Sequence, residues 1–488
     1  MQVSIWELAI LIIYVVALFF IFAFSLTQLH LTSVYKKFKK RSKLKAPEVS
    51  NWPRVTVQLP VFNELYVIER LIESVGKLNY PKERLEIQVL DDSTDESAEI
   101  AAKKIKELQQ KGIDIKHIFR PDRSGFKAGA LDYGLKSAKG EFIAIFDADF
   151  IPAPDFLKKT IPYFMYSEIG VVQTRWGHIN KNYSILTKLQ AFGLDAHFSI
   201  EQVGRMASGS FINFNGTGGI WRKNCIIDAG GWNDDTLTED LDLSYRAQIS
   251  GWKFHYLEDL VSPAELPIIM PAVKSQQFRW NKGAAETARK NLSKLWQTEL
   301  PLLNKIHGTF HLLNSSVFLF LLVAAIISVP LLYIKDSSPG LNWLFDLGTV
   351  FLIGFLGLSY YFWEANKHIG NSGKTSFWRF LKTYFLFLTM SMGLSLHNAI
   401  AVFEGWIGKR SPFIRTPKFN VSDKKSWRKN RYLNLAFSPM ILLEAFFALY
   451  FIFGIAYGIY IEDYGMILFH FMLATGFSMV FYHSAKAT

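Results

Sequence analysis

Long apolar runs near both ends of the chain, with none between them, constrain its fold more than any other feature. Residues 4–26 contain about 20 apolar positions, enough to cross the hydrocarbon core of a bilayer as one helix. Further apolar runs occupy residues 314–334, 342–363, 378–402, 435–460 and 464–483. Between residues 53 and 266 no run is long enough to span a bilayer. The sequence therefore predicts a membrane protein with a large extramembrane unit after its first helix.

Basic residues gather beside the apolar runs, and their positions set the expected topology. Seven Lys and Arg residues lie within 36–45 and nine within 409–431. Because basic segments that flank membrane spans stay on the cytoplasmic side, both segments are expected to face the cytosol. The run 378–402 has a polar second half and is expected to be interfacial or re-entrant, which leaves five crossings. The net charge of +12 follows from this distribution, so no nucleic-acid partner is expected.

The N-terminal run and the single cysteine agree with this topology. Residues 1–26 lack a basic start and a small-residue cleavage pattern, so they predict a retained transmembrane helix and not a cleaved signal. Cys225 is the only cysteine, which excludes a disulfide framework and a cysteine-based metal site. The middle of the chain is therefore expected to lie in the reducing cytosol.

Short β-branched runs alternate with a helical pattern in the extramembrane unit. Apolar runs at 54–61, 85–92 and 141–149 end in polar residues, and residues 96–112 have apolar side chains at helical spacing. This alternation predicts an α/β unit with an open, largely parallel sheet. In such sheets ligands bind beyond the carboxyl ends of the strands. The first candidates for a site are the acidic pairs at those ends, which are Asp91 with Asp92 and Asp147 with Asp149.

Asp147 and Asp149 are two residues apart, so an extended backbone directs both carboxylates to the same side. Carboxylate oxygens suit Mg²⁺ or Mn²⁺, which proteins often bind together with phosphate groups. An isolated Asp-x-Asp is more commonly a solvated turn. The acidic segment "DDSTD" (91–95) closes an earlier predicted strand, and it makes metal binding the better interpretation.

Three further segments each allow a functional and a structural interpretation. In "RSGFKAGAL" (123–131), Lys127 could neutralise a phosphate or could be a surface lysine at a helix start. The segment "FNGTGGIWRK" (214–223) is either a ligand-facing turn or an ordinary loop. In "TLTEDLDLSYRA" (236–247), a carboxylate such as Asp240 could act as a general base. Acidic residues also commonly begin a helix without any further role.

The segment "SQQFRWNKG" (275–283) places Gln276, Arg279 and Trp280 at spacings of three and four. On a helix these spacings put the three side chains on one face. That face either anchors the helix at the membrane surface or faces a ligand. An indole offers an apolar platform for a sugar ring, and a guanidinium forks onto phosphate oxygens.

Taken in order, these segments resemble the membrane-embedded family 2 glycosyltransferases, which include the cellulose, hyaluronan and plant mannan and glucan synthases. The resemblance covers residues 54–292 and is strongest to the plant mannan and glucan branch. It rests on "IQVLDDSTD", "GFKAGAL", "AIFDADF", "VQTRWGHIN", "FNGTGGIWR", "TEDLDLSYRA", "GWKF", "ELP" and "QQFRW". It implies a cytosolic α/β domain of the GT-A (Rossmann-like) type after the first transmembrane helix, then interfacial helices and an all-α transmembrane bundle.

The implied boundaries divide the chain into five parts. They are an N-terminal transmembrane helix (1–30), a basic cytosolic linker (31–52), the glycosyltransferase domain (53–266), interfacial helices with the Q-x-x-R-W motif (267–312) and the transmembrane bundle (313–488). Within the bundle, a cytosolic loop at 404–431 contains "FIRTPK" (413–418). This segment is similar to the F-x-V-T-x-K gating loop of bacterial cellulose synthase. Phe413, Thr416 and Lys418 match that pattern, and Arg415 replaces its valine.

The resemblance also implies a role for each candidate residue, and all nine are expected around one nucleotide sugar. The implied roles are catalytic base for Asp240; donor binding for Asp91, Asp92, Lys127 and Arg279; acceptor binding for Gln276 and Trp280; and metal binding for Asp147 and Asp149.

The implied activity is the inverting transfer of a hexose from UDP-glucose or GDP-mannose. The expected product is a β-linked glucan or mannan, β-1,4 in type, that leaves through the transmembrane helices. The alternative is a single transfer to a lipid, as in ceramide glucosyltransferase, and a third interpretation is a transporter or scaffold that only binds nucleotides. The expected partners are the nucleotide sugar, a polysaccharide or lipid acceptor, and the membrane. The expected location is the bacterial inner membrane or its equivalent, with the catalytic domain in the cytosol.

Overall fold

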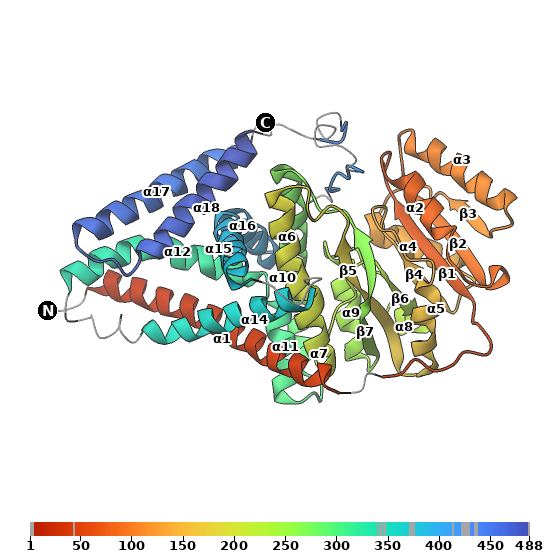
Figure 1. Ribbon diagram of the computed structural model, residues 1–488, viewed down its shortest axis with the longest axis horizontal. Helices are drawn as coiled ribbons and strands as arrows, with labels where there is room; N and C mark the ends of the chain where they lie inside the picture. The colour runs from red at the N-terminus through yellow and green to blue at the C-terminus, as the bar shows by residue number, and fades with distance from the viewer. Residues whose placement is uncertain are drawn as a thin grey trace.

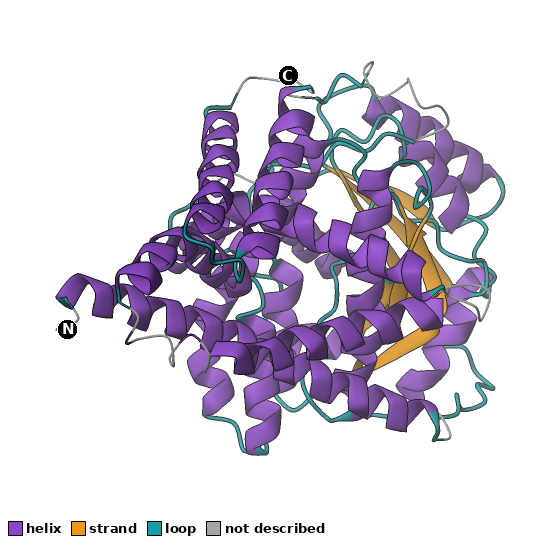
Figure 2. Ribbon diagram, turned by 60° about the vertical axis from the view of Figure 1, so that its left-hand side comes forward, coloured by secondary structure: helices purple, strands orange, loops and turns teal. Residues whose placement is uncertain are grey.

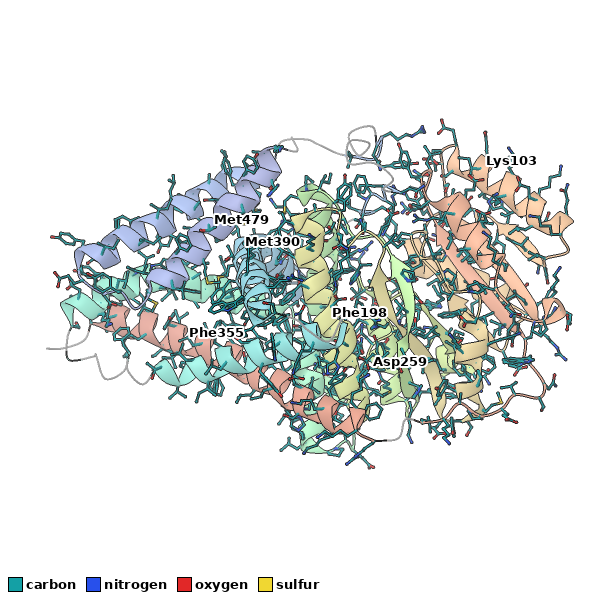
Figure 3. The ribbon with its side chains drawn as sticks, in the orientation of Figure 1. Lys103, Phe198, Asp259, Phe355, Met390 and Met479 are labelled. Atoms are coloured by element: carbon teal, nitrogen blue, oxygen red, sulfur yellow. The ribbon has the colours of Figure 1, made fainter. Side chains whose placement is uncertain are left out.

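A seven-stranded sheet and a set of long helices form the two halves of the molecule (Figure 1). The computed structural model describes residues 4–41, 44–338, 340, 345, 348–369, 376–411, 414–420, 430–433 and 438–486. Side chains pack throughout both halves, and Phe198 lies where they meet (Figure 3). The α/β unit expected from the alternation of strands and helices is confirmed.

The sheet is mixed, and most of its strand pairs are parallel. Its strands are β1 (Val55–Val61), β2 (Leu85–Asp91), β3 (Ile115–Ile118), β4 (Phe142–Ile145), β5 (Ile169–His178), β6 (Gly219–Arg222) and β7 (Lys253–Ala264), in the spatial order β3-β2-β1-β4-β6-β5-β7. Strand β6 is antiparallel to both β4 and β5, whereas the other pairs are parallel. The carboxyl ends of β1, β2 and β4 therefore lie along one edge, where the acidic pairs were expected.

Helices cover both faces of the sheet (Figure 2). One face contacts α2 (Ile68–Val75), α3 (Ser97–Gln110) and α5 (Phe156–Thr160). The other contacts α4 (Phe126–Ser137), α8 (Lys223–Asp228) and α9 (Glu239–Ile249). Alternation along β1 turns Val57 toward the first face and Gln58 toward the second. The Gln58 amide donates to Gln88 at 3.1 Å, so the buried polar side chains are paired across neighbouring strands. Short helical turns occur at η1 (Lys82–Arg84) and η2 (Ile161–Met165).

Four helices in the described residues are long and apolar enough to cross a membrane, as a membrane protein requires. They are α1 (Ile5–Lys39), α12 (Ser316–Ser337), α17 (Met440–Tyr460) and α18 (Ile467–Ala485). Helices α15 (Phe377–Gly393) and α16 (Ser395–Trp406) are bent by 52° and reach this length only together. The bend falls in the run for which an interfacial or re-entrant path was expected. The expected crossing at 342–363 lies partly outside the described residues; after η5 (Gly348–Phe351), its described part enters α14 (Leu352–Ile369).

A layer of helices joins the two halves. It contains α6 (Ile185–Ala196), the π-helical turn η3 (His197–Glu201), α7 (Gln202–Ala207), α10 (Met270–Trp296) and α11 (Leu302–Leu312) (Figure 1). Polar side chains fix α10 to the bundle helices. Lys274 is paired with Glu444 of α17, and Lys282 with Glu404 of α16 at 3.1 Å. Because these contacts lie on one side of α10, its other side is available to the sheet.

Candidate active site

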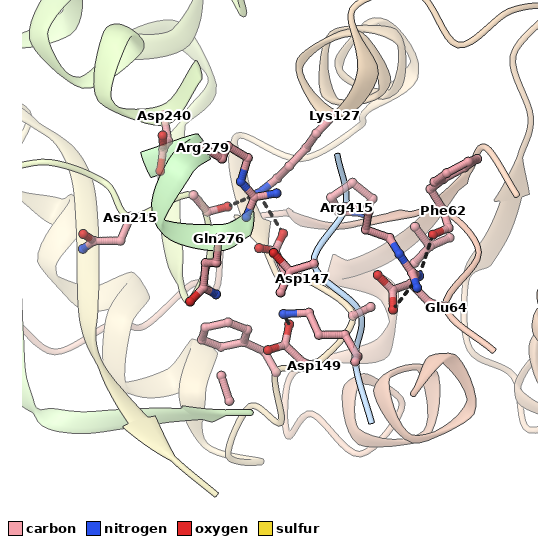
Figure 4. A pocket seen from close by; sticks show the side chains of 18 of the residues that line it. Phe62, Glu64, Lys127, Asp147, Asp149, Asn215, Asp240, Gln276, Arg279 and Arg415 are labelled. Carbon is pink, nitrogen blue, oxygen red and sulfur yellow. Dashed lines mark hydrogen bonds and ion pairs between the residues drawn. The ribbon is translucent and has the colours of Figure 1, made fainter. Parts of the chain in front are cut away.

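A cavity of about 1250 Å³, including its open mouth, lies at the carboxyl ends of β1 and β4. Its walls also come from the starts of α4 and α9, from α10, and from the segment 414–420, which we call the strap. Eight of the nine residues expected at the site line this cavity. They are Asp92, Lys127, Asp147, Asp149, Asp240, Gln276, Arg279 and Trp280. The side chains of Asp147, Asp149, Gln276 and Arg279 point toward the same space (Figure 4).

Lys127 forms the cationic centre of one wall. Its ammonium lies 2.7 Å from Asp147 Oδ1 and 3.6 Å from Glu239 Oε1, and it donates to the Gly216 carbonyl at 2.9 Å. Burial works to lower the pKa of Lys127, but Asp147 and Glu239 outweigh it and raise that pKa above its ordinary value. Lys127 therefore remains charged, as a partner for an anionic ligand must be.

Asp240 lies beside this cation on the first turn of α9. Burial, reinforced by the adjacent Glu239 and opposed by Lys127, raises the pKa of the Asp240 carboxyl to about 7. A carboxyl with this pKa can accept a proton near neutral pH, which is the property a general base needs. Gly216 lies against both Asp240 and Lys127. It has φ +77°, and a Cβ there would lie 2.9 Å from Asp240 Oδ2 and 3.2 Å from Lys127 Nζ.

Asp149 is buried below Asp147 and is paired with the strap. Its Oδ1 lies 2.8 Å from Lys418 Nζ, and its Oδ2 accepts from the Glu265 amide at 3.3 Å. Asp147 has different contacts. Its backbone amide donates to Thr217 Oγ1 at 2.8 Å, and its carboxylate is paired with Lys127. The two carboxylates thus face one cavity, and each has a lysine as its counter-ion.

The strap contributes two cations and a threonine to the cavity wall. Arg415 lies 3.2 Å from Glu64 Oε2 and donates to the Phe62 carbonyl at 3.0 Å. Burial raises the pKa of Glu64 to about 7, against the opposing charges of Arg415 and Lys418. Thr416 lines the cavity beside them. Phe413, the first residue of the gating-type pattern, lies outside the described residues.

Helix α10 turns the Q-x-x-R-W side chains toward the cavity. Gln276 is buried, and Arg279 and Trp280 lie on the same wall. A second indole, Trp176 of β5, also lines the cavity, with its ring centre 6.5 Å from that of Trp280. One face of Trp176 stacks on Phe198 at 4.8 Å. The cavity therefore has an aromatic end as well as a charged end.

Asp91 and Asp92, which are adjacent in the chain, point in different directions. Asp91 lies outside the cavity lining; its carboxylate contacts His117 at 2.7 Å and accepts from the Ser93 amide at 2.8 Å. Asp92 does line the cavity. Its two oxygens accept from Arg120 at 2.7 and 2.6 Å. Because successive residues at a strand end alternate in direction, only one of the pair reaches the site.

Sequence reasoning did not select several residues that contact the site. These are Glu64, Arg120, Glu265 and Trp176. Glu64 could have been predicted, because it follows β1, and β1 ends at the same edge of the sheet as β2 and β4. Glu265 accepts from the amides of Phe419 and Asn420 at 3.3 and 3.0 Å. No sequence pattern indicates that contact, because it joins segments that lie far apart in the chain.

The carboxylates suit a divalent cation that is shared with a phosphate ligand. In the described part of the chain no group of three or more His, Cys, Asp or Glu residues forms a complete metal site. Asp147 and Asp149 supply two oxygen ligands, and Mg²⁺ typically uses one or two protein carboxylates plus phosphate oxygens. Among the residues with described positions, buried Asp149 Oδ1 has no hydrogen-bond donor apart from its ion pair with Lys418. The donor set fits such an ion.

Comparison with known proteins identifies the domain. The profile of the glycosyltransferase-like family 2 matches residues 53–283. Residues 53–283 belong to family 2 of the glycosyltransferases. The family 2 domain begins just before β1 and ends within α10, so the match includes the charged wall of the cavity and the Q-x-x-R-W residues.

Plant enzymes are similar to about half of the chain. Glucomannan 4-beta-mannosyltransferase 7 of Arabidopsis thaliana is 40% identical over 284 residues, which cover 57% of this chain and 50% of the relative. Glucomannan 4-beta-mannosyltransferase 2 of the same plant is 45% identical over 251 residues, which cover 50% of this chain and 47% of the relative. The chain thus spans about half the length of the curated relatives it matches. These similarities support the resemblance to the plant mannan and glucan branch that the motifs indicated.

A solved structure shares the fold at low sequence identity. The mannosyltransferase PcManGT from Pyrobaculum calidifontis, determined with GDP-Man and Mn²⁺, superimposes with a TM-score of 0.54 and 19% identity. The match covers 74% of this chain and 99% of the other. The expected GT-A fold is therefore confirmed.

Proposed function

We propose that this chain is an inverting hexosyltransferase that extends a β-1,4-linked mannan or glucan. The observation that carries the proposal is the arrangement of Asp240, Lys127 and Trp280 on the walls of one cavity. A carboxyl with a pKa near neutrality, a fixed cation and an indole on the cavity wall are the groups that a sugar transfer from a nucleoside diphosphate requires. The similarity to glucomannan 4-beta-mannosyltransferases supports the same reaction class.

The proposed donor is GDP-mannose or UDP-glucose, with its diphosphate at the charged end of the cavity. Lys127 and Arg279 bind the phosphate oxygens, and Asp92 contacts the nucleotide. Asp91 supports the strand end through His117, so we assign it no contact with the donor. Asp147 and Asp149 are the residues that would hold Mg²⁺ or Mn²⁺, an ion that neutralises charge on the leaving diphosphate when it is bound. The neighbouring structure PcManGT was solved with GDP-Man and Mn²⁺, which supports this donor class.

In the proposed mechanism the acceptor hydroxyl attacks the anomeric carbon from the side opposite the diphosphate. Asp240 takes the hydroxyl proton onto a carboxylate oxygen as the new glycosidic bond forms. The bond from the anomeric carbon to the diphosphate oxygen breaks in the same step, and its electron pair leaves with the nucleoside diphosphate. Lys127 and Arg279 stabilise that negative charge. A single displacement inverts the configuration, so an α-linked donor gives a β-linked product.

The acceptor is proposed to lie at the aromatic end of the cavity. Trp280 offers its indole face to the terminal sugar, and the Gln276 amide bonds with its hydroxyl groups. Helix α10 carries both residues and is fixed to α16 and α17 by ion pairs. The acceptor end of the cavity is therefore adjacent to the bundle, which is the side from which a growing polymer would leave. The proposed topology is multi-pass, with the family 2 domain in the cytosol.

The decisive experiment offers labelled GDP-mannose and UDP-glucose to membranes that contain this chain, with divalent metal present and absent. Products are sized and then digested with mannanase and cellulase. A metal-dependent polymer that one β-1,4 glycanase degrades supports the proposal. A lipid-extractable monoglycoside would instead identify a single-transfer enzyme. Binding of both nucleotide sugars without transfer of either sugar would contradict an enzymatic function.

A further inference from the structure

Arg120 lies outside the cavity lining, next to Asp92, and its guanidinium makes four hydrogen bonds. It follows β3, and its guanidinium binds both oxygens of Asp92, with Nε to Oδ1 at 2.7 Å and Nη2 to Oδ2 at 2.6 Å. Both side chains of this pair are only 7% exposed. The same guanidinium donates to the carbonyls of Ser124 and Phe126, the latter at 2.7 Å. Arg120 thus joins the end of β2 to the turn before α4.

That turn has an unusual backbone conformation. Gly125 has φ +66° and Phe126 has φ +47°, so two successive residues lie in the left-handed region. A non-glycine residue there persists only where surrounding contacts hold it, and such residues cluster at functional sites. The two carbonyls that Arg120 binds flank Gly125. Lys127 follows immediately, so the direction of its side chain depends on this turn.

Gly129 shows how closely the turn and the guanidinium pack. A Cβ at this position would lie 2.1 Å from the Ser124 carbonyl oxygen and 2.5 Å from Arg120 Nη1. The second glycine of "GFKAGAL" therefore leaves room for the Arg120 guanidinium beside the Ser124 carbonyl.

We propose that Arg120 is a positioning residue that fixes Asp92 and Lys127 relative to each other, so that the nucleotide-binding and diphosphate-binding groups of the donor site are already placed before the donor arrives. This inference rests on the proposed function, because it concerns the nucleoside diphosphate end of the same cavity. A planar fork is needed, since it must bind two carboxylate oxygens and two carbonyls at once. A lysine keeps the charge but cannot make these four bonds together.

The chain contains a matched control for this arginine. Arg246 binds Asp242 Oδ2 through Nε at 2.8 Å and donates to the carbonyls of Ala229 and Gly231. It therefore has the same kinds of partner, but its partner Asp242 lies outside the cavity lining, whereas Arg120 binds Asp92, which lines the cavity. Loss of its fork is expected to lower stability without changing the donor site.

The test compares Arg120→Lys with Arg246→Lys in the full-length, detergent-purified chain. Binding of UDP and of GDP, each with Mn²⁺, is measured by calorimetry alongside the thermal midpoint. Arg120→Lys is expected to weaken nucleotide binding by about ten-fold or more, a common result of misplacing a binding group, and to raise the donor KM while the acceptor KM stays unchanged. Arg246→Lys is expected to lower the midpoint and leave nucleotide affinity unchanged. Equal nucleotide affinity in wild type and Arg120→Lys overturns the inference.

A double-mutant cycle tests the link to Lys127. If Arg120 places Lys127, then Arg120→Lys weakens nucleotide binding less in a Lys127→Met background than in the wild type. Strictly additive effects overturn this part of the inference. Arg120→Gln provides a second variant with the same expectation. If the wild type binds neither nucleotide, both the proposed function and this inference are wrong. If the wild type binds nucleotide and substitution of Arg120 does not change the affinity, only this inference is wrong.

Discussion

Lys418 of the strap lies 2.8 Å from Asp149, a carboxylate that we propose as a metal ligand. A protein cation and a divalent cation cannot share the same carboxylate oxygen without strong repulsion. On the proposed assignment, Lys418 and the metal ion compete for this carboxylate. Arg415 makes a parallel contact with Glu64, so the strap binds the cavity through two ion pairs.

Replacing Lys418 by methionine is expected to tighten Mn²⁺ binding in the absence of nucleotide. Removal of a unit charge a few ångströms from the ion changes the binding free energy by at least about 1 kcal/mol, which corresponds to an affinity gain of about five-fold. Electron paramagnetic resonance of free Mn²⁺ measures this gain directly. Lys409→Met serves as the control, because Lys409 pairs with Glu404 away from Asp149. Unchanged or weaker Mn²⁺ binding in Lys418→Met would show that the pair does not compete.

Asp240→Asn is expected to retain donor binding and to lose transfer. The amide has nearly the same shape but cannot take the acceptor proton, and loss of a general base commonly costs about 10²- to 10⁴-fold in rate. Nucleotide affinity and turnover are measured on the same preparation. Asp235→Asn, an exposed carboxylate just before α9, should leave both unchanged. Near-normal turnover in Asp240→Asn would rule out this residue as the base.

The pH dependence of kcat/KM follows from the same carboxyl. Its pKa is raised to about 7, and only the deprotonated form accepts a proton, so the rate should increase as pH rises through about 7. Glu239 helps to raise that pKa, so Glu239→Gln should shift this limb of the profile to lower pH. Rates are recorded from acidic to mildly alkaline pH in both proteins. A limb that does not move would mean that another group titrates.

Gly216→Ala should damage catalysis beyond its effect on stability. A left-handed backbone costs an L-residue about 1–2 kcal/mol, and here the added Cβ would also press on Asp240 and Lys127. Gly112 is a matched control, since it has φ +74° and a Cβ added there would meet no atom of the described residues within 4 Å. Gly216→Ala should lower the thermal midpoint at least as much as Gly112→Ala, but only Gly216→Ala should lose turnover. Equal turnover in the two variants would contradict the contact between Gly216, Asp240 and Lys127.

Trp280→Leu should weaken acceptor binding and leave donor binding intact. The leucine keeps the helix and its apolar character but removes the flat platform for a sugar ring. The acceptor KM and the rate of donor hydrolysis are measured separately. Trp296, an exposed tryptophan at the end of the same helix, provides the control substitution to leucine. A donor-binding defect in Trp280→Leu would place the indole at the other end of the cavity.

Much of the site could be predicted from local patterns. Asp147 and Asp149 follow a buried strand, and strands of a parallel sheet bring their carboxyl ends to one edge. The spacing of Gln276, Arg279 and Trp280 likewise determined a shared helix face, because α-helical geometry is the same in any context. The apolar runs determined which segments could cross a membrane, since length and hydropathy suffice for that inference.

Only the tertiary structure decided which of two adjacent acids reaches the cavity. Asp91 and Asp92 are equivalent in the sequence, yet one contacts His117 and the other Arg120. The structure also brought the strap to Asp149 and the Arg120 fork to the turn before Lys127. These contacts depend on distances between segments that only packing brings together, and no local propensity encodes them. The sequence by itself determined the helices and strands and the sheet edge at which the candidate residues lie. The directions of the side chains and the ion pairs between distant segments are known only from the folded structure.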